Sequence, residues 1–92
     1  MKKGETKTGF EFCVDERVLN DWKVVKLVAK IQKNESPMDS IECIESLGKI
    51  TLTEKGFERM LKHIEKLNDG FCPIEKVGDE IADIFEQVNS KN

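Results

Sequence analysis

The spacing of the apolar residues changes from strand-like to helical early in the chain. Within residues 8–14, Phe10, Phe12 and Val14 alternate with polar or small residues, as in a β-strand that buries one face. A lone strand needs a partner for its backbone. The pattern therefore predicts that residues 8–14 pair locally with residues 49–52 or add to the edge of a neighbouring subunit.

After this segment the apolar residues recur in steps of three and four, which is typical of amphipathic helices. Helix-capping residues and breakers lie between these runs. Ser36 caps the second helix and Gly48 closes it, Thr53 caps the third helix, and Gly78 leaves open a break in the fourth. The predicted helices cover residues 21–33, 37–47, 54–68 and 73–89, with one turn at 16–19 before the first.

The length of 92 residues fits one domain with a modest core. We therefore expect a mainly α fold: a small four-helix domain with a short N-terminal β-strand or hairpin. Residues 8–89 form the single helical domain, residues 1–7 are expected as a flexible N-terminal arm, and residues 90–92 as a frayed tail.

Composition narrows the classes of function. The net charge of −3 argues against general nucleic-acid binding, and no apolar run approaches the about 18 residues that a membrane span needs. The three cysteines are widely spaced and odd in number, so we expect reduced thiols in a cytoplasm. Neither a CxxC motif nor a glycine-rich phosphate loop occurs, so no metal, nucleotide or other cofactor is expected.

Candidate catalytic groups are sparse. His63 is the only histidine, and the sequence provides no third group that would orient a Cys–His pair, so a boundary or surface histidine is the simpler interpretation. Four acidic residues follow one face of the last helix and are interpreted as a solvated face: Glu75, Asp79, Asp83 and Glu86. We expect no enzymatic activity.

The candidate binding residues are aromatic, aliphatic and basic. Four lysines share one face of the first helix. They could meet phosphate or the carboxylates of a partner protein, but a solvated face is the simpler interpretation. Trp22 lies on the apolar stripe of the same helix, which favours a core position, although tryptophan is also enriched at interfaces. The candidate partner-binding residues are Trp22, Lys23, Lys26, Lys30, Lys33, Phe71, Ile74, Phe85 and Val88.

Two stretches of sequence suggest a family. The chain reads GFEFCVDERVLNDW at residues 9–22 and DGFCPIEKVGDEIADIFEQV at residues 69–88, separated by a helix that starts at Ser-Pro and by EKGFERMLKHI. This order resembles the tail assembly chaperones of long-tailed bacteriophages over residues 8–89. The matching positions are Gly9, Phe10, Phe12, Val14, Asp15, Asn20, Asp21, Trp22, Asp69, Gly70, Pro73, Ile74, Glu75, Glu80, Ile81, Ile84, Phe85 and Glu86.

The resemblance implies a non-enzymatic protein that binds and solubilises the tape-measure protein and helps to recruit tail-tube subunits. It also implies a homo-oligomer in the cytoplasm of the bacterial host, absent from the mature virion. Two alternatives remain: a small protein-binding adaptor, or a helix-turn-helix DNA-binding regulator of a mobile element. Against the second, Glu54, Glu58 and Glu65 on the third helix would repel phosphate.

Overall fold

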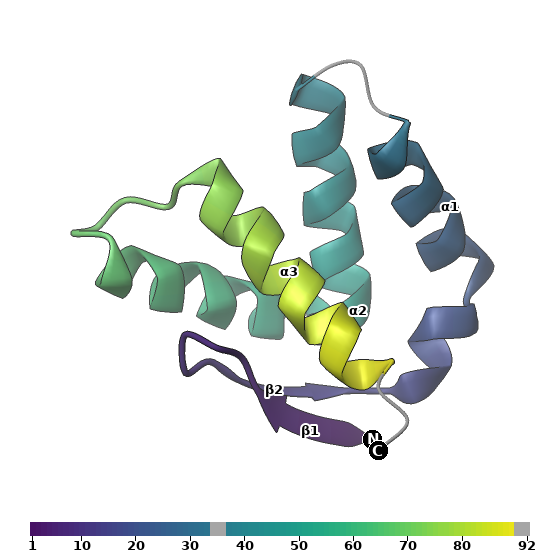
Figure 1. Cartoon of the computed structure of the whole chain (residues 1–92), viewed down its shortest axis with the longest axis horizontal. Helices are drawn as coiled ribbons and strands as arrows, with labels where there is room; N and C mark the ends of the chain where they lie inside the picture. Colours follow the sequence, from purple (N-terminus) through teal and green to yellow (C-terminus); the bar gives the residue numbers. More distant parts are fainter. Residues whose placement is uncertain (34–36, 90–92) are drawn as a thin grey trace.

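The computed structural model of the chain describes residues 1–33 and 37–89, without the side chains of residues 32 and 37–39. This part of the chain is mainly helical, with three helices and one antiparallel hairpin (Figure 1). The elements in chain order are β1 (Lys2–Glu5), β2 (Glu11–Val14), the 3-10 helix η1 (Glu16–Asn20), α1 (Trp22–Gln32), α2 (Pro37–Leu67) and α3 (Ile74–Val88).

The partner of the predicted strand is the N-terminal segment. β1 pairs antiparallel with β2, so that Lys2 lies opposite Val14 and Glu5 lies opposite Glu11. This finding corrects two expectations: residues 2–5 are not an arm, and residues 49–52 are helical. The side chains of β1 are only half-buried or exposed, so the strand lacks the apolar alternation that would have marked it.

Aspartates cap the N-terminal ends of the next two elements, η1 and α1. Asp15 accepts a hydrogen bond from the backbone N–H of Arg17 at 3.0 Å, and Asp21 accepts one from that of Lys23 at 2.8 Å. The side chain and then the backbone of Arg17 lower the pKa of Asp15 to about 2. The helix that follows, α1, packs chiefly on α2, and its Val24 is buried in the core.

The second and third predicted helices are one bent element, α2, so the expected count of four helices is not met. The bend lies at Thr53, whose φ of 71° and ψ of 167° are not helical. Its hydroxyl oxygen accepts a hydrogen bond from the N–H of Gly56 at 3.3 Å, so Thr53 caps the second half as predicted. Gly48 does not end a helix. Instead, a Cβ at Gly48 would overlap the ring of Phe57, so glycine permits the close contact across the bend. The predicted cap Ser36 lies outside the described residues.

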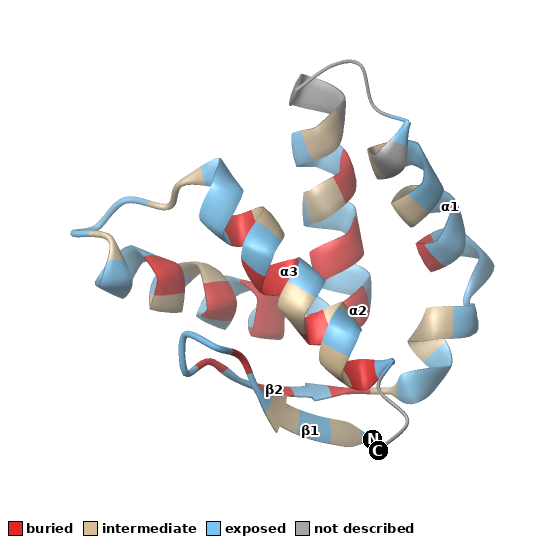
Figure 2. Ribbon diagram, viewed as in Figure 1, coloured by how far each residue is buried: buried red, intermediate tan, exposed pale blue. Residues whose placement is uncertain are grey.

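The last helix, α3, continues through Gly78 without a break. It crosses the bend of α2 and runs beside the hairpin, and the buried positions of these three parts face one another (Figure 2). The core is formed by Phe10, Phe12, Val14, Val24, Leu47, Leu52, Phe57, Met60, Ile64, Val77, Ile81, Ile84 and Val88. No helix in the described part of the chain is long and apolar enough to cross a membrane.

Candidate functional site

A buried carboxylate on α3 forms hydrogen bonds with the hairpin loop. Glu80 is only 4% exposed, and its two oxygens accept hydrogen bonds from the Thr8 hydroxyl at 2.8 and 2.9 Å. The Nε2 atom of His63, on α2, lies 3.0 Å from the same hydroxyl oxygen. Because the Thr8 proton points to the carboxylate, His63 must donate to Thr8. Two further bonds join the hairpin to α3: the Lys7 N–H in the loop donates to Asp83 at 2.8 Å, and the Gln87 amide donates to the carbonyl of Glu5, the last residue of β1, at 2.8 Å.

The order of groups in this network differs from that of a catalytic triad. In a triad the hydroxyl gives its proton to histidine, and the acid binds the other histidine nitrogen. Here the carboxylate of Glu80 binds the hydroxyl of Thr8 directly. The network therefore holds the loop in place and keeps the buried charge hydrogen-bonded.

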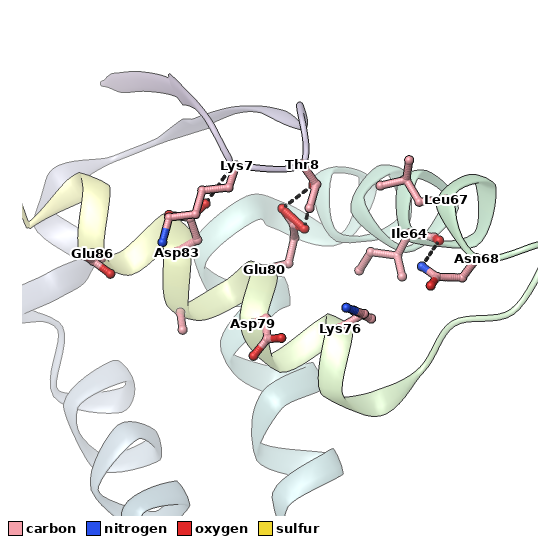
Figure 3. Close-up of a pocket in the computed structure, with 11 residues that line it drawn as sticks. Lys7, Thr8, Ile64, Leu67, Asn68, Lys76, Asp79, Glu80, Asp83 and Glu86 are labelled. Carbon is pink, nitrogen blue, oxygen red and sulfur yellow. Dashed lines mark hydrogen bonds between the residues drawn. The ribbon is translucent and has the colours of Figure 1, made fainter.

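A groove of about 540 Å³ opens beside this network, between the hairpin loop, the second half of α2 and α3 (Figure 3). Its walls combine apolar side chains of α2 with the acidic face of α3. The lining residues are Lys7, Thr8, Ile64, Leu67, Asn68, Lys76, Asp79, Glu80, Ala82, Asp83 and Glu86. Among the described residues, no group of three or more His, Cys, Asp or Glu side chains is placed to hold a metal ion.

Trp22 is not a core residue. Its side chain is 77% exposed, whereas Val24, two residues further along α1, is only 1% exposed and lies in the core. This finding corrects the core position favoured by the apolar stripe. An exposed tryptophan on a small domain is a candidate binding residue. A large apolar side chain in water is energetically unfavourable, and a partner that buries it gains binding free energy.

Three lysines of α1 and Lys33, the residue that follows the helix, are exposed. Within residues 1–33 and 37–89, the ion pairs are Arg17–Asp15 and Lys49–Glu45, so these lysines have no carboxylate partner there. They form one positive surface: Lys23, Lys26, Lys30 and Lys33.

The remaining predicted residues separate into three situations. Phe71, in the connection between α2 and α3, is 72% exposed, and Ile74, the first residue of α3, is 59% exposed. Phe85 is half-buried and lines a groove between α1 and α3. Val88 is only 5% exposed and belongs to the core, so it is not on the surface as expected: the apolar face of α3 that contains it packs inward.

An apolar groove of about 200 Å³ lies next to Ile74. It is lined by Ile41, Ile44, Glu45, Phe57, Leu61, Cys72, Ile74 and Val77. Burial, and to a lesser extent the Glu65 carboxylate, raises the pKa of the Cys72 thiol. A thiol that stays protonated behaves as a small apolar side chain, so Cys72 contributes to the apolar wall of this groove.

The sequence interpretation missed Thr8 and Glu80. A signal for Glu80 was present, because it lies three residues after Val77 and one before Ile81, within the apolar stripe of α3. An acidic residue at such a position must be buried with a donor or must distort the helix face. The chain itself gave no indication that the donor would be Thr8, 72 residues away.

Comparison of the chain with family models, curated protein sequences and solved structures gave no match.

Proposed function

We propose that this protein is a non-enzymatic tail assembly chaperone of a long-tailed bacteriophage, which binds and solubilises the tape-measure protein and helps to recruit tail-tube subunits. The observation that carries the proposal is the pair of large apolar side chains, Phe71 and Ile74, left in solvent beside an apolar groove. The order of sequence signals that resembles this family adds the identity of the client.

The geometry suits a client that is a long amphipathic helix. Such helices bind by laying apolar residues, spaced by three and four, into a groove between helices. Burying one exposed Phe or Ile side chain contributes about 1.5–3 kcal/mol. Contacts at Phe71 and Ile74 together supply about 3–6 kcal/mol before the cost of association, which corresponds to dissociation constants from about 6 mM to about 40 µM at best. Weak contacts of this size, repeated along a long client, keep it soluble and still allow release during assembly.

Co-expression with the tape-measure protein tests the proposal. The wild-type chain should raise the soluble fraction of the client, and Ile74→Asp or Phe71→Asp should lower that gain. Both side chains are largely exposed, so neither substitution should unfold the domain. Leu67→Asp is the matched control, because Leu67 is also an exposed apolar residue (56%) but lines the acidic groove instead. A client that stays insoluble with the wild-type chain present contradicts the proposal.

A DNA-binding regulator is not favoured. The two halves of α2 would have to serve as the two helices of the reading motif. The second half carries the exposed side chains of Glu54, Glu58 and Glu65, which repel phosphate. A salt-dependent mobility shift with duplex DNA would favour this alternative over the chaperone.

A further inference from the structure

The first helix carries a second apolar stripe that the core does not use. Trp22 and Val25 are 77% and 51% exposed, and Ala29 is also exposed. At 3.6 residues per turn these three positions, separated by three and four, lie on one side of the helix. Val24 is 1% exposed, and at about 100° per residue it lies about 160° from Trp22 around the helix. The domain therefore keeps the apolar residues of this stripe in solvent.

The stripe borders a concave seat. A groove of about 450 Å³ separates α1 from the C-terminal half of α3, and Phe85 stands on the wall opposite to Val25. The lining residues are Leu19, Val24, Val25, Val28, Ala29, Phe85, Glu86 and Asn89. Both walls provide apolar side chains, so a helix lying in this groove would make contacts along its whole apolar face.

The outer rim on the α1 side, beyond the residues that line the groove, is positively charged. In the helical projection, the lysines at positions 23, 26, 30 and 33 follow the stripe on the flank that points away from α2. Between Trp22 and Gln32 the chain has no acidic residue, and no ion pair within the described residues neutralises the lysines. An occupant therefore gains most if carboxylates lie on the flank that meets this rim.

We propose that the groove between α1 and α3 binds an amphipathic helix of a partner protein, with acidic residues along the flank facing the lysines of α1 and Trp22 as the aromatic anchor. The proposal concerns a different surface from the groove at Phe71 and Ile74. It holds whether or not the partner belongs to a phage tail.

Other occupants fit this seat less well. A nucleic acid or an anionic membrane would meet the lysines, but Glu86 on the opposite wall repels phosphate, and the apolar floor is concave. A second copy could offer the acidic face of its α3. That face exposes Ala82 between Asp79 and Glu86 and so lacks the large apolar side chains that would cover Trp22.

The test uses two synthetic helical peptides with the same apolar face, one with glutamates and one with lysines along the flank that meets α1. Trp22 is the only tryptophan, so its fluorescence reports burial at this site directly. The acidic peptide should shift the emission to shorter wavelength in a saturable titration. The basic peptide should bind at least about tenfold more weakly, and the difference should shrink near 1 M salt, where the Debye length falls to about 3 Å.

A charge-reversed pair of variants makes the assignment specific. Lys26→Glu with Lys30→Glu should lower the affinity for the acidic peptide by about tenfold or more and raise that for the basic peptide. The matched control reverses Lys55 and Lys62, which are exposed on the second half of α2 and should leave both affinities unchanged.

Four results would overturn the proposal. They are equal binding of both peptides, no binding of either, a stronger response to duplex DNA or anionic vesicles, and a concentration-dependent blue shift without peptide. The last result, with a matching mass in sedimentation, would assign the seat to a second copy of the chain.

Discussion

Replacing Thr8 by valine should release the hairpin loop from α3. Valine has nearly the shape of threonine but lacks the hydroxyl that donates to both oxygens of Glu80. Glu80 is only 4% exposed, so little water reaches its carboxylate to replace the lost donor. His63 also loses its acceptor. The substitution therefore leaves a buried charge without the bond that the native fold provides.

The expected magnitude follows from these contacts. A hydrogen bond to a charged group is worth about 1.5–3 kcal/mol, and a buried acceptor left without its donor costs about the same. Partial relaxation of the exposed loop lowers this cost. We therefore expect the free energy of unfolding to fall by about 2 kcal/mol. For a domain of this size that loss lowers the melting temperature by roughly 8–16 °C.

Urea unfolding followed by circular dichroism measures the effect. Thr8→Ser is the matched control, because serine keeps the hydroxyl and should cost much less. The double variant Thr8→Val with Glu80→Leu removes both partners and should be less destabilised than the sum of the two single variants, since no buried charge remains. A Thr8→Val protein within about 0.5 kcal/mol of wild type, or strictly additive variants, would refute the role assigned to this bond.

Three further outcomes are expected. Gly48→Ala should lower the free energy of unfolding by about 1–3 kcal/mol, because the added Cβ overlaps the ring of Phe57. Gly78→Ala should raise it by about 0.5–1 kcal/mol, because the added Cβ has its nearest neighbour at 4.0 Å and alanine favours the helix. Thermal melts of both variants beside wild type should therefore show melting temperatures that shift in opposite directions. In timed maleimide labelling with mass spectrometry, the exposed thiol of Cys13 should react before that of Cys72, whose pKa is raised by burial; equal rates would contradict this assignment. The pKa of Asp15 is lowered from 3.8 to about 2 in the folded protein. The ionised carboxylate therefore contributes its full stabilisation above pH 3.8, and this contribution disappears as the pH falls towards 2 and the group becomes protonated. The stability difference between wild type and Asp15→Asn should therefore shrink over that interval in urea titrations, and a constant difference would count against the pairing.

The sequence by itself determined the local elements. The caps at Asp15, Asp21 and Thr53 act on backbone N–H groups two or three residues away, so they can be recognised without knowing the rest of the fold. The apolar stripe of α3 also follows from spacing alone, because the helix repeat places its members on one face. The exposed lysines of α1 and the exposed side chains of Phe71 and Ile74 agree with their interpretation as surface residues.

Only the tertiary structure decided which of these faces are covered. In the folded chain Val88 is buried and Trp22 is exposed to solvent. The partner of β2 is the polar segment 2–5, and α2 continues through Gly48 to the bend at Thr53. Each outcome depends on contacts between segments far apart in the chain. The local spacing of apolar residues does not show which distant segment will pack against a given face. The same reason explains why the surfaces proposed for binding are defined by the arrangement of the helices, although their residues could be named from the sequence.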